Sequence, residues 1–462
     1  MTATLSHTTM SRALAAAELR QHIEELTAAI AEAERTSRTT RMLDLTFQLN
    51  EAQRKLNSFV DPMAQLPLEI QSHIFLYVLH SKDELGHVSI PRANSRLPPI
   101  SFLSVSCLWR DIALSSPNLW RELELELPSK DSNYFDLCGL FLSRARNLSL
   151  SLTLRGPLDL EPGALDLVVQ HSHQLENLTL NQEAKRRELT LALERPRPRS
   201  LTFRLERGTQ LPCLKTLVLQ PSAATEFGTV EELLDVFRAA PALSTFTLDN
   251  TWFDLLSASV SGPFTHASVH TLSLGSPLYH DEELRTLTTP TMVLYLTLPA
   301  LKNLSVHILN LTYYDVVAFL SRSSPPLESL HMSIPVVWRP IPDLADFLRH
   351  VPTLKTLHLC TRRTYRDVDC CVELLRSSDF LPNLRAIELD ADIQVPVDYE
   401  RVARMLTLRG TGSSVRLESF ELRFLASSNL GLPLPAHVKS TLQQLVQDGM
   451  KIYIGPPQEN ML

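Results

Sequence analysis

Glycine is scarce in this sequence, with 13 residues among 462. Loops that hold phosphate groups depend on glycine, and the chain has no G-x-G-x-x-G or Walker A pattern. The H-E-x-x-H pattern of zinc proteases and the G-x-S-x-G pattern of serine hydrolases are absent too. We therefore expect no cofactor, no metal ion and no catalytic residue, and the chain is predicted not to be an enzyme.

Several other features are missing. The six cysteines include no C-x-x-C pair, so zinc-ribbon and redox motifs are lacking. No window approaches the roughly 18 apolar residues of a membrane span, and the first 20 residues lack the apolar core of a secretory signal. The net charge of -7 gives no global attraction to nucleic acid or anionic membrane. We expect a soluble intracellular protein, cytoplasmic or nuclear, that binds neither.

Proline is abundant, with 30 residues, and a six-residue motif recurs along the chain. The motif reads apolar–polar–polar–apolar–polar–apolar, as in Leu175 to Leu180, and a weaker copy begins at Ala145. Successive motifs begin 26 to 39 residues apart. The nine starts are Leu175, Leu214, Leu243, Val269, Leu301, Leu327, Leu354, Leu384 and Leu417.

Each motif predicts a short strand, because its last positions alternate with period two. Helical stretches lie between motifs, such as Val230 to Phe237 and Asp315 to Leu320, and six motifs have proline two residues before the start. One strand and one helix in about 28 residues is typical of leucine-rich repeats. We predict an α/β fold in which residues 121–455 form a leucine-rich-repeat solenoid. A globular α/β domain is the alternative, but it leaves nine matching motifs unexplained.

The fifth position of the motif and the seventh, just beyond it, should face a groove that binds a target protein. The predicted groove residues are Val218, Thr247, Ser273, Ser305, His331, His358, Glu388 and Glu421, with Trp252, Tyr279 and Trp338 following strands as anchors. Strand spacing places His331 and His358 roughly 5 Å apart, with Cys360 on the same face and His307 one strand away. A zinc or pH-sensing site is conceivable there, but a polar binding face is the favoured interpretation.

The repeat is interrupted once, over residues 181–210, where basic residues outnumber acidic ones. A solvated loop is favoured there over a site for an acidic partner or phosphopeptide. Near the C-terminus a helix around Val438 to Val446 and a strand from Lys451 to Ile454 suggest a closing repeat. Residues 456–462 are predicted to be a frayed tail.

Residues 12–60 have helix-forming composition, whereas residues 1–11 are expected to be disordered. Two apolar stripes step by three and four residues: Leu19, Ile23, Leu26, Ile30 and Ala33, then Met42, Leu45, Leu49, Ala52, Leu56 and Phe59. The stripes are out of phase between residues 36 and 40, which fits a stutter in one coiled coil or a turn between two paired helices. The coiled coil would make the protein self-associate, and both interpretations stay open.

Residues 61–120 carry three spaced patterns. They are Leu66-Pro67-Leu68-Glu69-Ile70 with Ile74-Phe75, then Val105-Ser106-Cys107-Leu108-Trp109-Arg110, then Ser116-Pro117-Asn118-Leu119-Trp120. Here the chain resembles the F-box family. The resemblance implies a small helical domain that docks on the Skp-type adaptor of a cullin-RING ubiquitin ligase. The residues implied in that contact are Leu66, Pro67, Ile70, Ile74, Phe75, Val105, Cys107 and Trp109. The stretch from 81 to 100 is longer than usual in the family, which puts the middle of the interface in doubt.

The predicted function is therefore the substrate-recognition subunit of an SCF-type ligase. Its F-box would bind the adaptor, and its repeats would hold a target protein that the sequence does not identify. The alternative is a repeat scaffold that assembles through its N-terminal helices and has no role in ubiquitin transfer.

Overall fold

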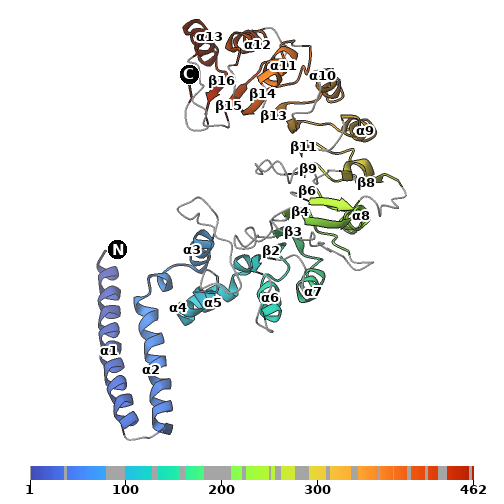
Figure 1. Cartoon of the computed structure of the whole chain (residues 1–462). Helices are drawn as coiled ribbons and strands as arrows, with labels where there is room; N and C mark the ends of the chain where they lie inside the picture. Colours follow the sequence, from blue (N-terminus) through green and yellow to red (C-terminus); the bar gives the residue numbers. More distant parts are fainter. Residues whose placement is uncertain are drawn as a thin grey trace. The chain divides into compact units, whose positions relative to one another are not determined.

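Figure 1 presents the protein as a computed structural model of the whole chain. The described residues are 2–35, 39–79, 99–126, 134–156, 162–181, 210–220, 225–248, 251–254, 262–275, 291–307, 313–334, 342–362, 365–377, 379–392, 397–411, 415–424, 434–456 and 460–462. The chain divides into two compact units, Met1–Leu152 and Thr153–Leu462. The division falls within a strand, Leu150–Arg155.

Unit 1 begins with two long helices, α1 (Thr2–Arg35) and α2 (Thr39–Val60). They pack side by side as an antiparallel hairpin (Figure 1). Of the apolar stripes, Leu26, Ala33 and Ala52 are buried in this seam. The structure thus favours the paired-helix interpretation of residues 12–60. Helix α1 also includes residues 2–11, for which we expected disorder.

The rest of unit 1 is mostly short helices. They are η1 (Pro62–Gln65), α3 (Leu68–Leu79), α4 (Phe102–Val105), α5 (Cys107–Ser115), η2 (Pro117–Trp120) and α6 (Tyr134–Ser143). Two neighbouring strands, β1 (Glu122–Glu126) and β2 (Leu150–Arg155), complete it, with the unit boundary inside β2. Trp120 is the last residue of the helices that precede β1. Its buried ring donates a hydrogen bond from Nε1 to the Ala113 carbonyl at 2.7 Å.

Unit 2 is built on a large parallel sheet. Ten of its strands follow one another in chain order, β3-β4-β6-β9-β11-β12-β13-β14-β15-β16. Their bounds are β3 Leu175–Asn181, β4 Thr216–Gln220, β6 Thr245–Leu248, β9 Thr271–Leu274, β11 Asn303–His307, β12 Ser329–Ile334, β13 Thr356–Arg362, β14 Ala386–Asp392, β15 Ser419–Phe424 and β16 Lys451–Gly455. All nine predicted motif strands are present and in order. The coarse prediction of an α/β fold is confirmed.

Helices separate most of these strands and lie along one side of the sheet (Figure 1). They are α7 (Pro162–Gln170), α8 (Val230–Ala239), α9 (Tyr313–Ser323), α10 (Pro342–Arg349), α11 (Tyr365–Leu374), α12 (Tyr399–Thr411) and α13 (Ala436–Gln447). The fourth and sixth motif positions, such as Leu357 and Leu359, are buried. Every second strand residue therefore packs into the core, as period-two alternation requires.

One backbone hydrogen bond between neighbouring repeats recurs at the same position of the motif. The amide at the second motif position donates to the carbonyl at the same position of the preceding strand, as from Lys355 to Glu328 and from Arg385 to Lys355, both at 2.8 Å. Side chains add the ion pairs Lys215–Glu176, Lys355–Glu328 and Arg385–Glu418. These pairs are largely exposed, so each contributes little to stability. The backbone ladder fixes the strand order.

The sheet is less regular between β4 and β11. Two small parallel sheets occur here, β5 (Thr225–Thr229) with β7 (Thr251–Asp254) and β8 (Phe264–Thr265) with β10 (Leu296–Thr297). In the described part of the segment between β9 and β11, the only helix is η4 (Thr291–Tyr295). Arg322 of α9 stabilises this segment by donating to the carbonyls of Val293 and Leu296 at 2.7 and 2.8 Å.

The end of the chain is better ordered than predicted. Asn460 accepts a hydrogen bond from the Ile454 amide and donates one to the Ile452 carbonyl, both at 3.2 Å. The last residues thus attach to β16 instead of fraying. None of the helices in the described ranges is both long and apolar enough to cross a membrane.

Candidate protein-binding surfaces

Unit 1 exposes large apolar side chains around α3 and α4. Ile70 is 45% exposed and Val105 is 56% exposed. The full set, called here the α3–α4 apolar set, is Leu66, Leu68, Ile70, Ile74, Tyr77, Val78 and Val105. Isolated exposed apolar residues are common, but six on two short helices, with Leu66 just before α3, are typical of a surface that a partner covers.

An aromatic cluster holds α3, α4 and α5 together beneath this set. Phe75 of α3 stacks on Phe102 of α4 at 4.2 Å between ring centroids and lies 5.0 Å from the ring of Trp109 on α5. Phe75 is only 1% exposed. Because its ring is packed within this core, Phe75 cannot contact a partner directly. Its contacts hold α3 and α4 in place beneath the exposed residues.

The residues implied by the F-box resemblance therefore separate into two groups. Leu66, Pro67, Ile70, Ile74 and Val105 are exposed. Phe75 is buried, whereas Cys107 and Trp109 are half-buried. The first group is available to a partner, and the second shapes the surface.

Two polar residues that the sequence analysis missed fix this part of the chain. Asp61 caps η1 by accepting from the Met63 amide at 2.8 Å, and its other oxygen accepts from Trp109 Nε1 at 3.0 Å. Buried Gln71 donates through Nε2 to the carbonyls of Met63 and Leu66, at 2.6 and 2.7 Å. Asp61 before Pro62 is a helix-start signal that could have been found. The tertiary partner of Gln71 had no sequence signal.

In unit 2 the fifth motif positions form one row across the sheet. Ser305 pairs in register with His331, His331 with His358, His358 with Glu388, and Glu388 with Glu421. Val218, Thr247 and Ser273 continue the row through β4, β6 and β9. All of these side chains are half-buried rather than buried. The predicted groove residues are thus brought together on the strand face, apart from the aromatic anchors.

His331 and His358 are the centre of this strand face. Their rings stack at 4.1 Å between centroids, with an interplanar angle of 11°. His358 Nε2 lies 2.8 Å from Asp390 Oδ2, and its Nδ1 lies 3.7 Å from Glu388 Oε2. Burial first, and the neighbouring His358 second, lower the pKa of His331 to about 4. His331 is therefore neutral at pH 7.

Acidic residues gather at the C-terminal end of the strand face. Glu388, Asp390 and Glu421 lie on neighbouring strands, and Arg423 forms ion pairs with Glu421 and, at 3.8 Å, with Glu388. Asp390 and Arg423 occupy the seventh motif position, which has the same period-two phase as the fifth. The seventh position was expected to face the groove, but Asp390 and Arg423 were not among the predicted groove residues.

The residue types of a hydrolase triad occur here, but their connections do not match one. Ser305 Oγ lies 3.4 Å from His331 Nδ1, whereas Asp390 contacts the other ring, His358. In a triad one imidazole lies between the hydroxyl and the carboxylate. The imidazole accepts the proton of the hydroxyl, and the carboxylate stabilises the charged ring that results. In these contacts the hydroxyl and the carboxylate meet different rings.

A metal site finds no support among the residues whose placement is described. They contain no group of three or more His, Cys, Asp or Glu side chains arranged to hold an ion. Cys360 is buried, and the His307 side chain lies outside the description.

Several predicted features also fall outside the described residues. They are Tyr279, Trp338, most of the 81–100 stretch and nearly all of the basic segment 181–210. Trp252 lies on β7, outside the large sheet, and its side chain is not described.

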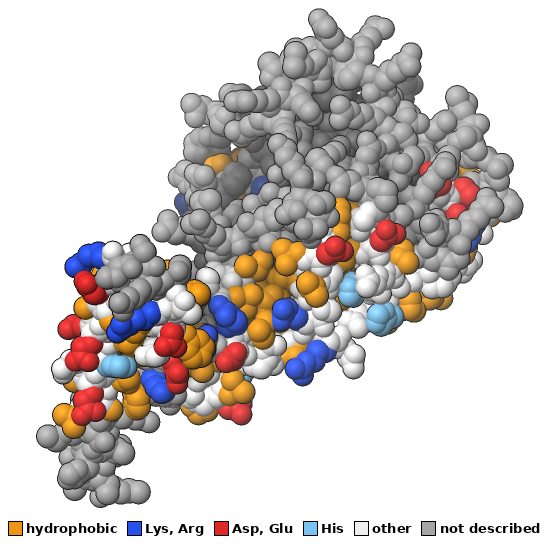
Figure 2. All heavy atoms as spheres, turned by 90° about the horizontal axis from the view of Figure 1, so that it is seen from below, with side chains coloured by type: hydrophobic (Ala, Val, Ile, Leu, Met, Phe, Trp, Pro, Cys, Tyr) orange, Lys and Arg blue, Asp and Glu red, His pale blue; other side chains and the backbone are white. Residues whose placement is uncertain are grey.

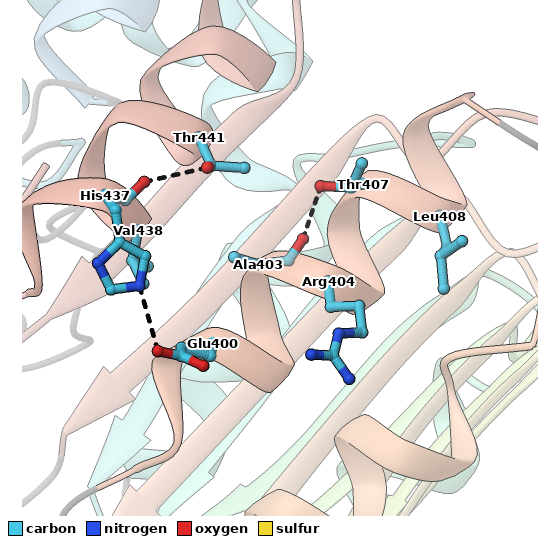
Figure 3. A pocket seen from close by; sticks show the side chains of 8 residues that line it. All are labelled: Glu400, Ala403, Arg404, Thr407, Leu408, His437, Val438 and Thr441. Atoms are coloured by element: carbon cyan, nitrogen blue, oxygen red, sulfur yellow. Dashed lines mark hydrogen bonds and ion pairs between the residues drawn. The ribbon is translucent and has the colours of Figure 1, made fainter.

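A hollow of about 330 Å³ lies between α12 and α13 (Figure 3). His437 and Glu400 contact each other at 3.2 Å at one side of it. The hydroxyls of Thr407 and Thr441 are used within their own helices, where they donate to the carbonyls of Ala403 and His437. Glu400, Arg404 and His437 are the charged or ionisable side chains of its lining.

The face drawn in Figure 2 carries basic, acidic and hydrophobic side chains interspersed.

Compared with models of known protein families, the chain matches none. It also matches no curated protein sequence. Its function therefore has to be argued from its own residues.

Proposed function

We propose that this chain is the target-recognition subunit of an SCF-type ubiquitin ligase. Residues 61–120 act as an F-box that binds a Skp-type adaptor, and residues 121–455 act as leucine-rich repeats that bind the target on the strand face. The chain is not an enzyme in this proposal, because the reactive thioester is carried by another subunit. It works by bringing the target close to that thioester.

The observation that carries the proposal is the α3–α4 apolar set. The F-box patterns place Leu66, Ile70, Ile74 and Val105 at an adaptor contact, and these four side chains are exposed. A small helical unit has too little interior to enclose all of its large apolar residues. A partner that covers them removes this area from water, at about 25 cal/mol for each Å².

The leucine-rich-repeat assignment is supported by the register of unit 2. Parallel strands recur in chain order, each from the same six-residue motif, with helices along one side of the sheet. This arrangement leaves one strand face for binding. The row from Ser305 to Glu421 supplies that face with hydroxyl, imidazole and carboxylate groups.

The test is co-purification with a Skp-type adaptor after co-expression. The full chain should form a stable complex, and Ile70→Glu combined with Val105→Glu should abolish it, because a carboxylate cannot be desolvated against an apolar partner. Leu140→Glu is the matched control, since Leu140 is 60% exposed on α6 of the same unit. It should leave the complex intact.

A repeat scaffold without a ligase role is the second candidate. It predicts no complex between the wild-type chain and any Skp-type adaptor, while target binding through the strand face persists. Wild-type co-purification therefore separates the two candidates without relying on a variant.

A further inference from the structure

The α1–α2 hairpin contains two lines of apolar residues on each helix. Residues seven apart lie above one another on a helix face. The first line holds Leu19, Leu26 and Ala33 on α1 with Leu45, Ala52 and Phe59 on α2. The second line holds Ala16, Ile23 and Ile30 on α1 with Met42, Leu49 and Leu56 on α2.

These two lines differ in burial. The first contains the buried contacts of the seam, Leu26, Ala33 and Ala52, whereas its outer members are half-buried (Leu19, Leu45) or 37% exposed (Phe59). In the second line only the small Ala16 is buried, and its five large side chains are half-buried. The hairpin therefore buries the middle of the first line and leaves every large side chain of the second line partly open to water.

The second line opens on the same side of the hairpin in both helices. On each helix it is offset from the first in the same rotational sense, because Ile23 precedes Leu26, and Met42 precedes Leu45, by three residues. In two antiparallel helices equal offsets turn toward one common side. Ile23, Ile30, Met42, Leu49 and Leu56 thus make one apolar strip along the hairpin, called here the open strip.

The charges of the two helices indicate what covers the open strip. Helix α1 has five acidic and three basic residues, whereas α2 has two acidic and three basic residues. If two hairpins pack strip to strip as four helices, each acidic α1 lies between its own α2 and the α2 of the other copy. Every neighbouring pair then has opposite net charge, which favours this pairing over like-charged arrangements.

We propose that two copies of this chain associate through their α1–α2 hairpins into a four-helix bundle. The contact is the same on both copies and closes after two subunits, so no filament grows from it. It gives the assembly two α3–α4 apolar sets and two strand faces, which raises the avidity for a target with two binding segments. The proposal does not depend on the ligase role.

The test is the mass of the full chain in solution, measured by sedimentation equilibrium over a range of concentrations. One chain has a mass of 52.0 kDa, and the expected mass is twice that value. A single-chain mass at every concentration overturns the proposal without any variant.

Two pairs of substitutions test the surface itself. Ile30→Glu with Leu49→Glu places charge in the open strip and should give the single-chain mass. Leu43→Glu with Phe47→Glu is the control, because these side chains are 66% and 67% exposed and belong to neither line. The control should keep the doubled mass, and dissociation there instead of at the strip contradicts the proposed surface.

A milder pair guards against misfolding of the charged variant. Ile23→Ala with Leu49→Ala keeps helix-forming residues and should weaken association at least tenfold, with unchanged helix content by circular dichroism. Undiminished association in this variant also overturns the proposal. Adaptor co-purification of the same proteins reports separately on the ligase role.

Discussion

The rings of His331 and His358 stack 4.1 Å apart on neighbouring strands of the parallel sheet. His358 contacts the carboxylates of Asp390 and Glu388. The His331 ring that stacks on it is neutral at pH 7, because burial lowers its pKa.

This relationship predicts a pH-dependent stability. Burial lowers the pKa of His331 in the folded chain from 6.5 to about 4. Above pH 6.5 both folded and unfolded forms are neutral there, so no stability is lost. Between pH 6.5 and about 4 the unfolded chain binds a proton that the folded chain does not, and stability falls with the pH.

His331→Phe removes this proton linkage and keeps a ring for stacking. Relative to the variant, the wild type should lose about 1–2 kcal/mol between pH 7 and pH 5, allowing for solvent screening. Urea unfolding at the two pH values measures the difference. An identical pH dependence of both proteins would rule the linkage out. His437→Phe, at an exposed position, should behave as the wild type.

Asp390 is predicted to be needed for target binding. Asp390→Asn removes the charge that lies 2.8 Å from His358 and leaves the side chain's size nearly unchanged. Proximity labelling in cells should lose the wild-type targets, while adaptor binding stays intact. Glu418→Gln is the control, because Glu418 is exposed directly before β15 of the same sheet. If both variants label the same proteins as the wild type, the strand face is not the target site.

Gln71 is predicted to stabilise unit 1. Gln71→Leu leaves the carbonyls of Met63 and Leu66 without their donor, which should cost about 2 kcal/mol in free energy of unfolding. It should also weaken adaptor binding, since Leu66 is no longer held against α3. Chemical denaturation measures the first effect. Gln53→Leu, exposed on α2, should change little. Equal stability of the two variants would contradict this role.

Arg409 is predicted to be the most sensitive basic residue of unit 2. Its buried guanidinium donates to the carbonyls of Leu375, Ser377, Phe380 and Leu381, which end α11 and form the turn before β14. Arg409→Met should destabilise unit 2 by about 3 kcal/mol or more, because several buried acceptors lose their partner. Arg404→Met, exposed on the same helix, should stay within about 0.5 kcal/mol of the wild type.

The positions of the strands in unit 2 were predictable because every second residue of each strand is apolar and buried. Leu357 and Leu359 alternate with polar residues, and this alternation recurs at each motif, so position and order followed directly. The partner of a polar side chain is decided by tertiary contact instead. Gln71 reaches carbonyls before its own helix, and Arg409 reaches the end of another helix. No pattern in the neighbouring sequence predicts either contact.

The N-terminal stripes illustrate a different limit. A pattern of apolar residues three and four apart requires a partner helix, but it does not say whether the partner belongs to the same chain. The structure pairs α1 with α2 and leaves Ile30 and Leu49 half-buried. Both interpretations of the stripes are therefore used, one within the chain and one, by our proposal, between two chains.

Whether residues 61–120 bind a Skp-type adaptor, as we propose, can be measured by isothermal titration of the purified full chain with a purified adaptor. Saturable binding of one adaptor per chain is expected, lost in the variant that combines Ile70→Glu with Val105→Glu and kept in Leu140→Glu. No saturable binding by the wild-type chain, with its unfolding transition intact, would rule out the proposed ligase role.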